Sequence, residues 1–335
     1  MTVGATTVVG IGYPAAWDAA DPGAFADGTA ALRALDPRIE IAEARYVDGQ
    51  DLSDADRTAF AEVEVLLTMH VPPDVVTLAP RLRWVQAIGA GVGQLVDRGL
   101  LDSGIRVTSA AGINAPSVAE FAVTQVLAHY KRLRELDAAQ SAHTWAALHG
   151  RELTGSTAVV IGLGAIGTRV ASLLAAFGVR VVAVRRDLTA KAPEQVDAVV
   201  GTESLLEALG EADIVVAAAA ATPETTGLMD AVTFAAMRPG AFFCNVGRGS
   251  LVDEDAIVDA LERGHLGGAA LDVTRVEPLP THSRLWDAPR LSLSAHVAST
   301  ADDHFRKVYG FFRDNLARYL SGEALRNEVH ADRGY

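Results

Sequence analysis

Short apolar runs rich in valine and isoleucine alternate along the chain with segments of helical periodicity. Strands of a parallel sheet are buried on both faces and are joined by helices, so this alternation predicts parallel sheets covered by helices. The alternation occurs twice, on either side of a long helical stretch. The sequence therefore predicts an α/β fold of two doubly wound parallel-sheet domains, with a Rossmann cofactor domain inserted in a flavodoxin-like substrate domain.

The first third of the chain predicts the smaller, flavodoxin-like sheet. Five strands are expected at residues 7–11, 40–45, 64–69, 84–88 and 106–109. Helical segments separate them, for example at 74–82 and 93–101.

A helical stretch over residues 115–147 then leads into a second strand–helix cycle. Its strands are expected at 157–161, 180–184, 214–218, 241–246, 269–273 and 290–294. A final helix over 302–320 carries an apolar stripe (Phe305, Val308, Phe312 and Leu316) and is expected to return to the first domain. The expected domains are a substrate (catalytic) domain of residues 1–112 and 301–335 and a dinucleotide-binding domain of residues 113–300.

Composition limits the classes of partner and the compartment. No apolar run reaches the roughly 18 residues that span a bilayer, and the N-terminus lacks the pattern of a signal peptide. The formal net charge of −13 argues against nucleic acid and anionic membranes as partners. Cys244 is the single cysteine, which excludes an intrachain disulfide and makes a cytoplasmic location the expectation.

The most informative local feature is a glycine-rich turn between an apolar run and a helix. Residues 162–167 read GLGAIG, directly after the expected strand 157–161. Gly162 permits the tight turn, Gly164 leaves room for a pyrophosphate, and Gly167 allows close helix–strand packing. The N–H groups that open the helix, including those of Ala165 and Ile166, suit an anion, so this turn predicts dinucleotide binding. A glycine turn without a ligand is the alternative.

The end of the next strand bears on the choice of cofactor. An acidic residue there normally binds the ribose 2′-hydroxyl, but this chain has Arg185 and Arg186, followed by Asp187. Two guanidinium groups suit a 2′-phosphate, so NADP is the expected cofactor in preference to NAD. In the alternative reading the arginines lie in a solvated loop and Asp187 serves the ribose.

Three motifs follow the glycine turn in a fixed order. They are FCNVGRGSLVDE at 243–254, LDVTRVEPLP at 271–280 and SAHVA at 294–298, and TPETTG at 222–227 precedes them. In these motifs the chain resembles the D-isomer-specific 2-hydroxyacid dehydrogenase family, whose arginine, glutamate and histidine motifs they match. The resemblance covers nearly the whole chain. It implies reduction of a small 2-keto acid to a D-2-hydroxy acid with NAD(P)H.

The chemistry of that reaction accounts for the residue types. A guanidinium at Arg248 can bind the substrate carboxylate and its carbonyl oxygen. An imidazole at His296 can donate the proton, and Glu277 can fix the ring and favour its protonated form. The resemblance implies these roles for the three residues, places Asp272 near the nicotinamide carboxamide, and adds Thr222 and Val246 to the cofactor site. No metal is expected.

The first domain contributes further candidates. Residues 84–92 resemble the family's substrate loop, in which the N–H groups of Ala90, Gly91 and Val92 would bind the substrate carboxylate, although a plain strand-to-helix turn is the alternative. His70, after Met69 at the end of an expected strand, is a candidate contact to the variable part of the substrate. Asn114 and Ser117 are candidate hinge or cap residues. Trp145 is expected in a helical arm that the family uses for dimer contacts, or in the core; a homodimer is expected by resemblance.

Two departures from the family pattern and three alternatives remain open. Ala295 and Ala220 stand where the family usually has prolines that line the nicotinamide site. A cofactor-sensing regulator on the same fold is one alternative, phosphite oxidation is the second, and formate oxidation, against which Glu277 argues, is the third. The sequence does not identify the keto acid; glyoxylate and hydroxypyruvate rank first.

Overall fold

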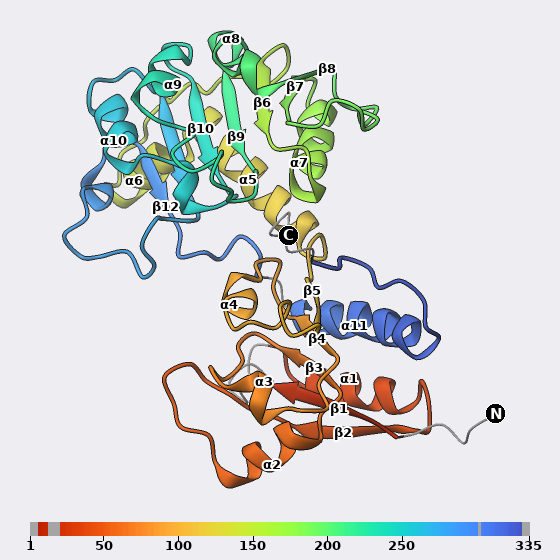
Figure 1. Ribbon diagram of the computed structural model, residues 1–335. Coiled ribbons are helices and arrows are strands. Elements are labelled where there is room, and N and C mark those ends of the chain that lie inside the picture. The colour runs from red at the N-terminus through yellow and green to blue at the C-terminus, as the bar shows by residue number, and fades with distance from the viewer. Residues whose placement is uncertain (1–5, 13–20, 301–302, 330–335) are drawn as a thin grey trace. The chain divides into compact units, whose positions relative to one another are not determined.

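The computed structural model describes residues 6–12, 21–300 and 303–329. The chain divides into two compact units, which are shown in Figure 1. Unit 1 comprises residues 1–113 and 301–335, and unit 2 comprises residues 114–300. No helix in the described ranges is long and apolar enough to cross a membrane.

Unit 1 is built on a parallel five-stranded sheet with the strand order β2-β1-β3-β4-β5, the flavodoxin-like order. Its strands are β1 (Thr7–Gly12), β2 (Ile39–Glu43), β3 (Val65–Thr68), β4 (Trp84–Ala87) and β5 (Arg106–Thr108). Its helices are α1 (Ala24–Arg33), α2 (Asp54–Glu62), α3 (Val75–Leu78), α4 (Gly93–Val96) and α11 (His304–Leu320).

The two faces of this sheet carry separate apolar clusters. One cluster includes Phe60, Val75 and Leu95 from α2, α3 and α4. On the other face, α1 and α11 pack side by side, and the predicted stripe of α11 is buried there against Trp84 and Leu32. The last helix of the chain therefore belongs to the core of unit 1.

Unit 2 is built on a parallel seven-stranded sheet with the order β12-β11-β10-β9-β6-β7-β8. Its strands are β6 (Thr157–Ile161), β7 (Arg180–Val184), β8 (Ala198–Val200), β9 (Ile214–Ala217), β10 (Phe242–Asn245), β11 (Gly268–Leu271) and β12 (Leu291–Leu293). Its α-helices are α5 (Ala115–Tyr130), α6 (Leu133–Ser141), α7 (Ala165–Ala176), α8 (Leu205–Glu211), α9 (Ala231–Ala236) and α10 (Glu254–Glu262). Three 3₁₀ turns are η2 (Thr202–Ser204), η3 (Gly249–Leu251) and η4 (Arg284–Asp287).

The strand order of unit 2 reverses at β6, where β7 and β9 lie on opposite sides. This is the doubly wound arrangement of a Rossmann domain, in which ligands bind outside the carboxyl ends of the strands at the reversal. Helices α5 and α7 cover one face of the sheet, and α8, α9 and α10 cover the other. The two-domain α/β fold expected from the sequence is confirmed.

Several expected elements are shorter or broken. The predicted helix at 115–147 is two helices, because Arg132 adopts a left-handed conformation with φ of 58° between α5 and α6. The expected helices at 74–82 and 93–101 are single turns, α3 and α4. The short edge strand β8 was not predicted, since its three residues follow a polar segment without alternation.

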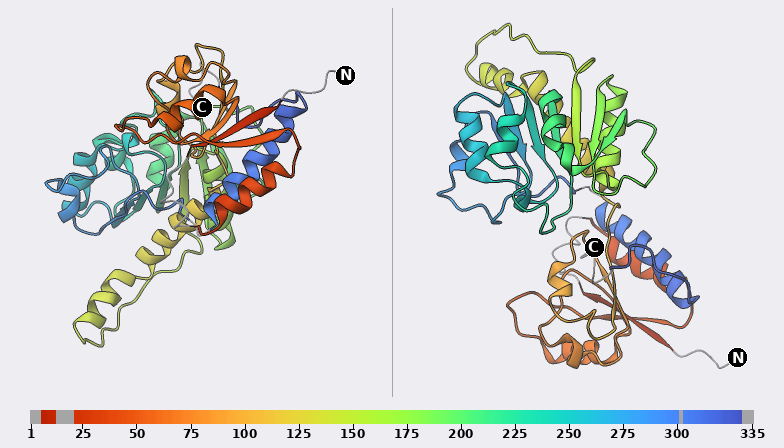
Figure 2. Two further views of the ribbon diagram at one scale, coloured as in Figure 1. Left: turned by 90° about the horizontal axis from the view of Figure 1, so that it is seen from below. Right: turned by 45° about the horizontal axis from the view of Figure 1, so that its top comes forward.

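The arm formed by α6 and the segment after it extends away from the rest of unit 2 (Figure 2, left). Trp145 lies in that segment, beyond the end of α6, and its side chain is 100% exposed. The expectations that it is helical or belongs to the core are therefore wrong.

Candidate active site

The glycine turn after β6 has the geometry that a bound pyrophosphate requires. Gly162 has a φ of 92°, and a Cβ on Gly167 would lie 1.9 Å from the carbonyl oxygen of Gly162. A Cβ on Gly164 would meet no atom within 4 Å, so the backbone is open to an incoming group at that residue. Helix α7 begins at Ala165, and its first N–H groups have no carbonyl of the helix to bind. The turn therefore fits a dinucleotide phosphate.

Arg185 and Arg186 follow β7, at the end of the strand next to that turn. The Arg185 guanidinium donates to the carbonyl of Ala190, while its buried Nε has no hydrogen-bond partner among the described residues. Arg186 is exposed. Asp187 accepts hydrogen bonds from Thr189 N and Oγ1 at 2.8 and 2.6 Å, which close a local turn and lower the pKa of its carboxyl group. Asp187 thus stabilises the loop that follows the two arginines.

Thr222 and Val246 follow β9 and β10 at the same carboxyl edge of the sheet. The Thr222 N–H donates to Thr225 Oγ1 at 2.7 Å, and Thr225 Oγ1 donates to the carbonyl of Ala220 at 2.8 Å. These bonds hold the turn where the family pattern has a proline in place of Ala220. Val246 is buried, and its N–H donates to Ala217 O at 3.0 Å.

The strongest constellation joins the loops after β11 and β12. His296 Nδ1 lies 2.8 Å from Glu277 Oε2, and Glu277 Oε1 accepts the Thr274 N–H at 3.0 Å. Partial burial opposes ionisation of Glu277, but the hydrogen bonds from His296 and Thr274 outweigh it, and its pKa is lowered. The Glu277 carboxylate therefore fixes the imidazole through Nδ1. Nε2 of His296 has no partner among the described residues.

Arg248 follows β10 and contributes a nearby positive charge. Its Nη1 donates to the carbonyl of its neighbour Gly247 at 2.7 Å, and no carboxylate in the described ranges pairs with it. Arg248 is close enough to lower the pKa of Glu277 by electrostatic attraction. The half-buried guanidinium thus keeps donors available near the His296–Glu277 pair.

Asp272 supports the loop that carries His296. Its carboxylate is 3% exposed and accepts three hydrogen bonds, from Ser294 Oγ at 2.6 Å and from the N–H groups of Val297 and Ala298 at 3.0 Å each. The His296 N–H donates to the Asp272 carbonyl at 2.8 Å. His296 itself has a φ of 55°, a conformation that a non-glycine residue adopts at a cost. These bonds hold the backbone of His296 in that conformation.

A cavity of about 610 Å³ within unit 2 brings these groups together. Asp272, Glu277 and His296 line it, together with an apolar side formed by Pro278, Leu279, Trp286, Leu293 and Ala295. Arg248 is not part of the lining. The structure therefore assembles two of the three predicted catalytic residues in one cavity and places the third outside it.

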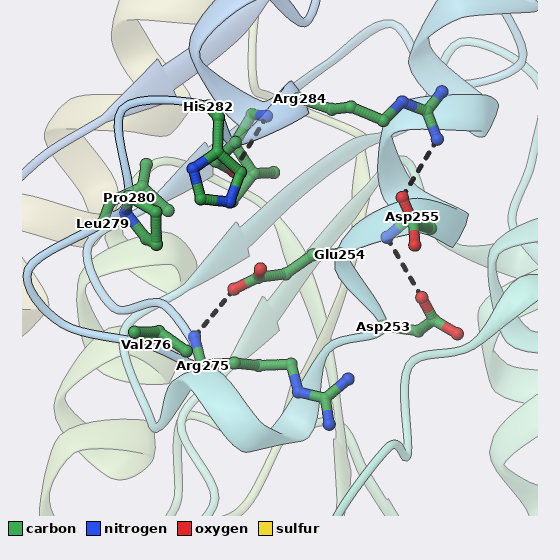
Figure 3. A pocket seen from close by; sticks show the side chains of 11 residues that line it. Asp253, Glu254, Asp255, Arg275, Val276, Leu279, Pro280, His282 and Arg284 are labelled. Carbon is green, nitrogen blue, oxygen red and sulfur yellow. Dashed lines mark hydrogen bonds and ion pairs between the residues drawn. The ribbon is translucent and has the colours of Figure 1, made fainter.

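A smaller pocket of about 270 Å³ lies beside the loop that carries Glu277 (Figure 3). Hydrogen bonds and ion pairs join the loop beside this pocket to α10. Arg284 pairs with Asp255 at 3.0 Å and with Asp259 at 2.9 Å, and Glu254 accepts the Arg275 N–H at 2.7 Å. Arg284 and Arg275 thereby tie the loop 275–285 to α10. No group of at least three His, Cys, Asp or Glu suited to a metal occurs in the described part of the chain.

The predicted substrate residues of unit 1 lie at the carboxyl ends of β3 and β4. The N–H groups of Ala90, Gly91 and Val92 make no hydrogen bond within the described structure, and Ala90 and Gly91 are exposed. Val92 is buried and caps α4 by position. His70 is half-buried, two residues beyond the end of β3.

The Ser117 side chain does not cap α5 but bonds to the segment after His296. Its Oγ donates to the carbonyls of Ala298 and Thr300 at 2.9 and 3.3 Å, which ties α5 to the segment after His296. Asn114 occupies the cap position of α5, but its side chain makes no capping bond.

Sequence reasoning missed three contributors to the site: Thr274, Ser294 and Trp286. Ser294 and Thr274 lie within the quoted motifs, two residues before His296 and two after Asp272. Their roles depend on the folding of the loops, which no periodic pattern encodes. Trp286 lies between the motifs at 271–280 and 294–298, outside both of them.

Comparisons with known proteins agree with this geometry. The family model described as "D-isomer specific 2-hydroxyacid dehydrogenase, NAD binding domain" matches residues 123–298. Glyoxylate/hydroxypyruvate reductase A of Serratia proteamaculans is 30% identical over 277 residues, which are 80% of this chain and 84% of that protein. D-3-phosphoglycerate dehydrogenase of Mycobacterium leprae is 32% identical over 308 residues. That alignment covers 90% of this chain, which spans only 57% of the length of that relative.

Solved structures show the same similarity over the whole chain. A D-isomer specific 2-hydroxyacid dehydrogenase from Xanthobacter autotrophicus, in complex with NADPH and MES, has a TM-score of 0.82 and 35% identity, covering 99% of this chain and 100% of that one. An NADPH-dependent glyoxylate/hydroxypyruvate reductase from Sinorhizobium meliloti, in complex with NADP and sulfate, has a TM-score of 0.78 and 28% identity, covering 98% and 100%. The chain belongs to the D-isomer specific 2-hydroxyacid dehydrogenase family.

Proposed function

We propose that this protein is an NADP(H)-dependent oxidoreductase that interconverts a 2-keto acid and a D-2-hydroxy acid. The observation that carries the proposal is the 2.8 Å hydrogen bond between His296 Nδ1 and Glu277 in a histidine that lines the cavity and whose Nε2 has no partner among the described residues. An imidazole held in this way can release a proton from Nε2 to a carbonyl oxygen and recover it in the reverse direction.

Each member of the trio has a separate task. Arg248 binds the substrate carboxylate and polarises the carbonyl, because its guanidinium donors are not consumed by an ion pair in the described structure. Glu277 orients His296 and stabilises the imidazolium, and its lowered pKa keeps it ionised at neutral pH. In unit 1, residues 90–92 are the proposed substrate contacts, because their N–H groups make no hydrogen bond within the described structure and can bind a carboxylate.

NADP(H), when bound, supplies or accepts the hydride. The glycine turn with Ala165 and Ile166 holds its phosphates, and Arg185 and Arg186 hold its 2′-phosphate. Thr222, Val246 and Asp272 complete that side of the site by resemblance. The bonds that Asp187 makes to Thr189 favour this assignment over a role for Asp187 at the ribose. Unit 2 is accordingly the dinucleotide-binding domain and unit 1 the substrate domain.

Two further assignments accompany the proposal. A homodimer is supported by the fully exposed Trp145 on the arm after α6, because a large exposed aromatic side chain favours burial against a partner. The cytoplasm is the compartment that suits the unpaired thiol of Cys244.

The test is cofactor oxidation, measured separately with NADPH and NADH against a panel of 2-keto acids that includes glyoxylate and hydroxypyruvate. We expect turnover with higher kcat/KM for NADPH. Replacement of His296 by alanine should lower kcat by about 10²–10⁴-fold and leave NADPH affinity within about twofold. Absence of turnover with every keto acid, despite NADPH binding, would contradict the proposal and favour phosphite-type chemistry or a sensor of the cofactor.

A further inference from the structure

The cavity beside His296 has two chemically distinct sides. The polar side includes His296, Glu277 and Asp272, the last of which the resemblance places at the nicotinamide, and Leu279, Trp286 and Leu293 form an apolar side. At about 610 Å³ the cavity is far larger than a two-carbon keto acid. All of its lining residues belong to unit 2.

Trp286 is the most unusual member of the apolar side. Its side chain is 54% exposed, although an indole of this size is ordinarily buried. The indole Nε1 donates to the Pro280 carbonyl at 2.9 Å, so the only polar atom of the side chain is already bonded. The indole therefore offers an apolar surface to whatever enters the cavity.

The segment that carries Trp286 is fixed by burial of Leu285 and by the ion pairs of Arg284. Leu285 is buried in the core, and its N–H donates to Ser283 Oγ at 3.3 Å. Arg284 pairs with acidic residues of α10, including Asp255, on the side shown in Figure 3. Trp286 thus lies in a turn whose conformation is fixed, as a preorganised binding surface requires.

The position of Arg248 assigns the cavity to one part of the substrate. Because Arg248 lies outside the lining and Asp272 is assigned to the nicotinamide, a substrate carboxylate bound to Arg248 leaves the apolar side of the cavity to the group on the other side of the carbonyl. Glu277 and Asp272 contribute carboxylates to the lining, which disfavours a negative charge on that group.

We propose that Trp286, with Leu279 and Leu293, forms a subsite for an apolar substituent of the 2-keto acid. The preferred substrates then carry a branched aliphatic or aromatic group in place of the hydrogen of glyoxylate or the hydroxymethyl group of hydroxypyruvate. This inference rests on the proposed reductase function and specifies the substrate class of the same site. A substituent that ends in a phosphate or carboxylate is disfavoured.

The expected selectivity follows from apolar burial. Each methylene that leaves water improves binding by about fourfold, and a hydrophobic pocket distinguishes one methylene by about tenfold or more. From glyoxylate to 4-methyl-2-oxopentanoate we therefore expect kcat/KM to rise by roughly 30-fold or more.

The experiment measures kcat/KM of the full chain with NADPH for glyoxylate, hydroxypyruvate, pyruvate, 2-oxobutyrate, 4-methyl-2-oxopentanoate and phenylpyruvate. Trp286→Ala should lower the value for 4-methyl-2-oxopentanoate by about tenfold and that for glyoxylate by less than about twofold. Trp286→Phe keeps an apolar ring without the N–H and should retain the preference. Leu206→Ala, at a half-exposed leucine of α8 outside the cavity, is the matched control.

Three outcomes overturn the subsite. The first is that glyoxylate or hydroxypyruvate has the highest kcat/KM. The second is that Trp286→Ala lowers kcat/KM equally for all substrates, and the third is that Trp286→Ala and Trp286→Phe change kcat/KM for 4-methyl-2-oxopentanoate equally. A thermal melt and NADPH titration of each variant confirm that it is folded. Turnover that favours glyoxylate contradicts the subsite alone. Absence of turnover with every keto acid contradicts the proposed function and the subsite together.

Discussion

At the scale of single residues, the Asp272 carboxylate positions His296 through hydrogen bonds to the loop that carries it. Asp272 uses both oxygens on the loop of His296, and its shortest bond is to Ser294 Oγ at 2.6 Å. Replacement of Ser294 by alanine removes a charge-assisted hydrogen bond from a buried carboxylate and loosens the backbone at His296. We expect kcat to fall by about tenfold while the Kd for NADPH changes by less than about twofold.

Ser294→Thr is the control for this prediction, because it keeps the hydroxyl group. Its kcat should remain near that of the unmodified protein. Steady-state kinetics with NADPH and the best keto acid separates the two variants. Equal losses of kcat in both variants would mean that packing, and not the hydrogen bond to Asp272, positions the loop.

A second residue, His129, predicts how stability depends on pH. Its ring stacks on Phe242 at 4.7 Å, and burial, reinforced by the charge of Arg151, lowers the pKa of His129 from 6.5 to about 4. Between these values the unfolded chain binds a proton that the folded chain does not, so stability is full above pH 6.5 and falls toward pH 4. Allowing for partial exposure, the loss is about 1–2 kcal/mol.

Replacement of His129 by glutamine should flatten this part of the profile. Urea unfolding of both proteins at pH 7, 6, 5 and 4.5 provides the measurement. The difference in unfolding free energy between the two proteins should narrow as the pH falls. A constant difference across this range would show that His129 is protonated equally in the folded and unfolded states.

Residue roles were predictable where chemistry dictates a residue type. The sequence led to a Glu277–His296 hydrogen bond because an acid–base imidazole needs an orienting partner, and the structure contains that bond. It placed Asp272 at the nicotinamide by resemblance, whereas the hydrogen bonds of Asp272 within the loop arise from the turn at residues 294–298. That turn depends on a left-handed conformation at His296, which propensity does not predict.

At the scale of elements, α10 links the core of unit 2 to the loop of the site. Asp253 caps the helix by accepting the N–H groups of Asp255 and Ala256 at 3.1 Å each. Asp255 and Asp259 pair with Arg284, and Figure 3 shows the pair with Asp255. The stability of α10 thereby supports the segment that carries Trp286.

Replacement of Asp253 by alanine should lower the unfolding free energy by about 1 kcal/mol, because two helix N–H groups lose their acceptor. Asp253→Asn keeps a capping oxygen and should cost only a few tenths of a kcal/mol. Denaturant unfolding followed by circular dichroism distinguishes the two variants. If alanine and asparagine destabilise equally, the charge of Asp253, and not its capping bond, stabilises the helix.

The elements most accurately predicted are the buried strands of unit 2. The observed bounds of β6 and β7 equal the expected ones, because apolar runs between glycine and polar residues mark both ends. The arm was mispredicted because helical periodicity continues across Arg132, where a tertiary contact overrides propensity. Gly150 packs against the backbone of Tyr130 and Lys131 there, and Lys131 Nζ donates to the carbonyl of Arg151 at 2.9 Å.

At the scale of the whole molecule, each unit has its own buried cores, and unit 1 is completed by the end of the chain. Asn315 of α11 is fully buried, and its Nδ2 donates to Gln86 Oε1 at 3.2 Å and to the carbonyl of Arg326 at 3.0 Å. Thr108 Oγ1 donates to the same Gln86 oxygen at 2.7 Å and accepts Trp84 Nε1 at 2.8 Å. This network joins residues more than 200 positions apart in the sequence.

Replacement of Asn315 by alanine leaves the amide of Gln86 and the backbone of Arg326 short of partners in a dry interior. A loss of about 2–3 kcal/mol in the unfolding free energy of unit 1 is expected, since unsatisfied buried polar groups cost about 1–3 kcal/mol each. Since the proposed cofactor residues lie in unit 2, NADPH affinity should change by less than about twofold. Calorimetry with and without NADPH tests both statements, because the cofactor should stabilise only the transition of unit 2. A variant that melts in one transition and loses NADPH binding would show instead that the two units fold as a single cooperative structure.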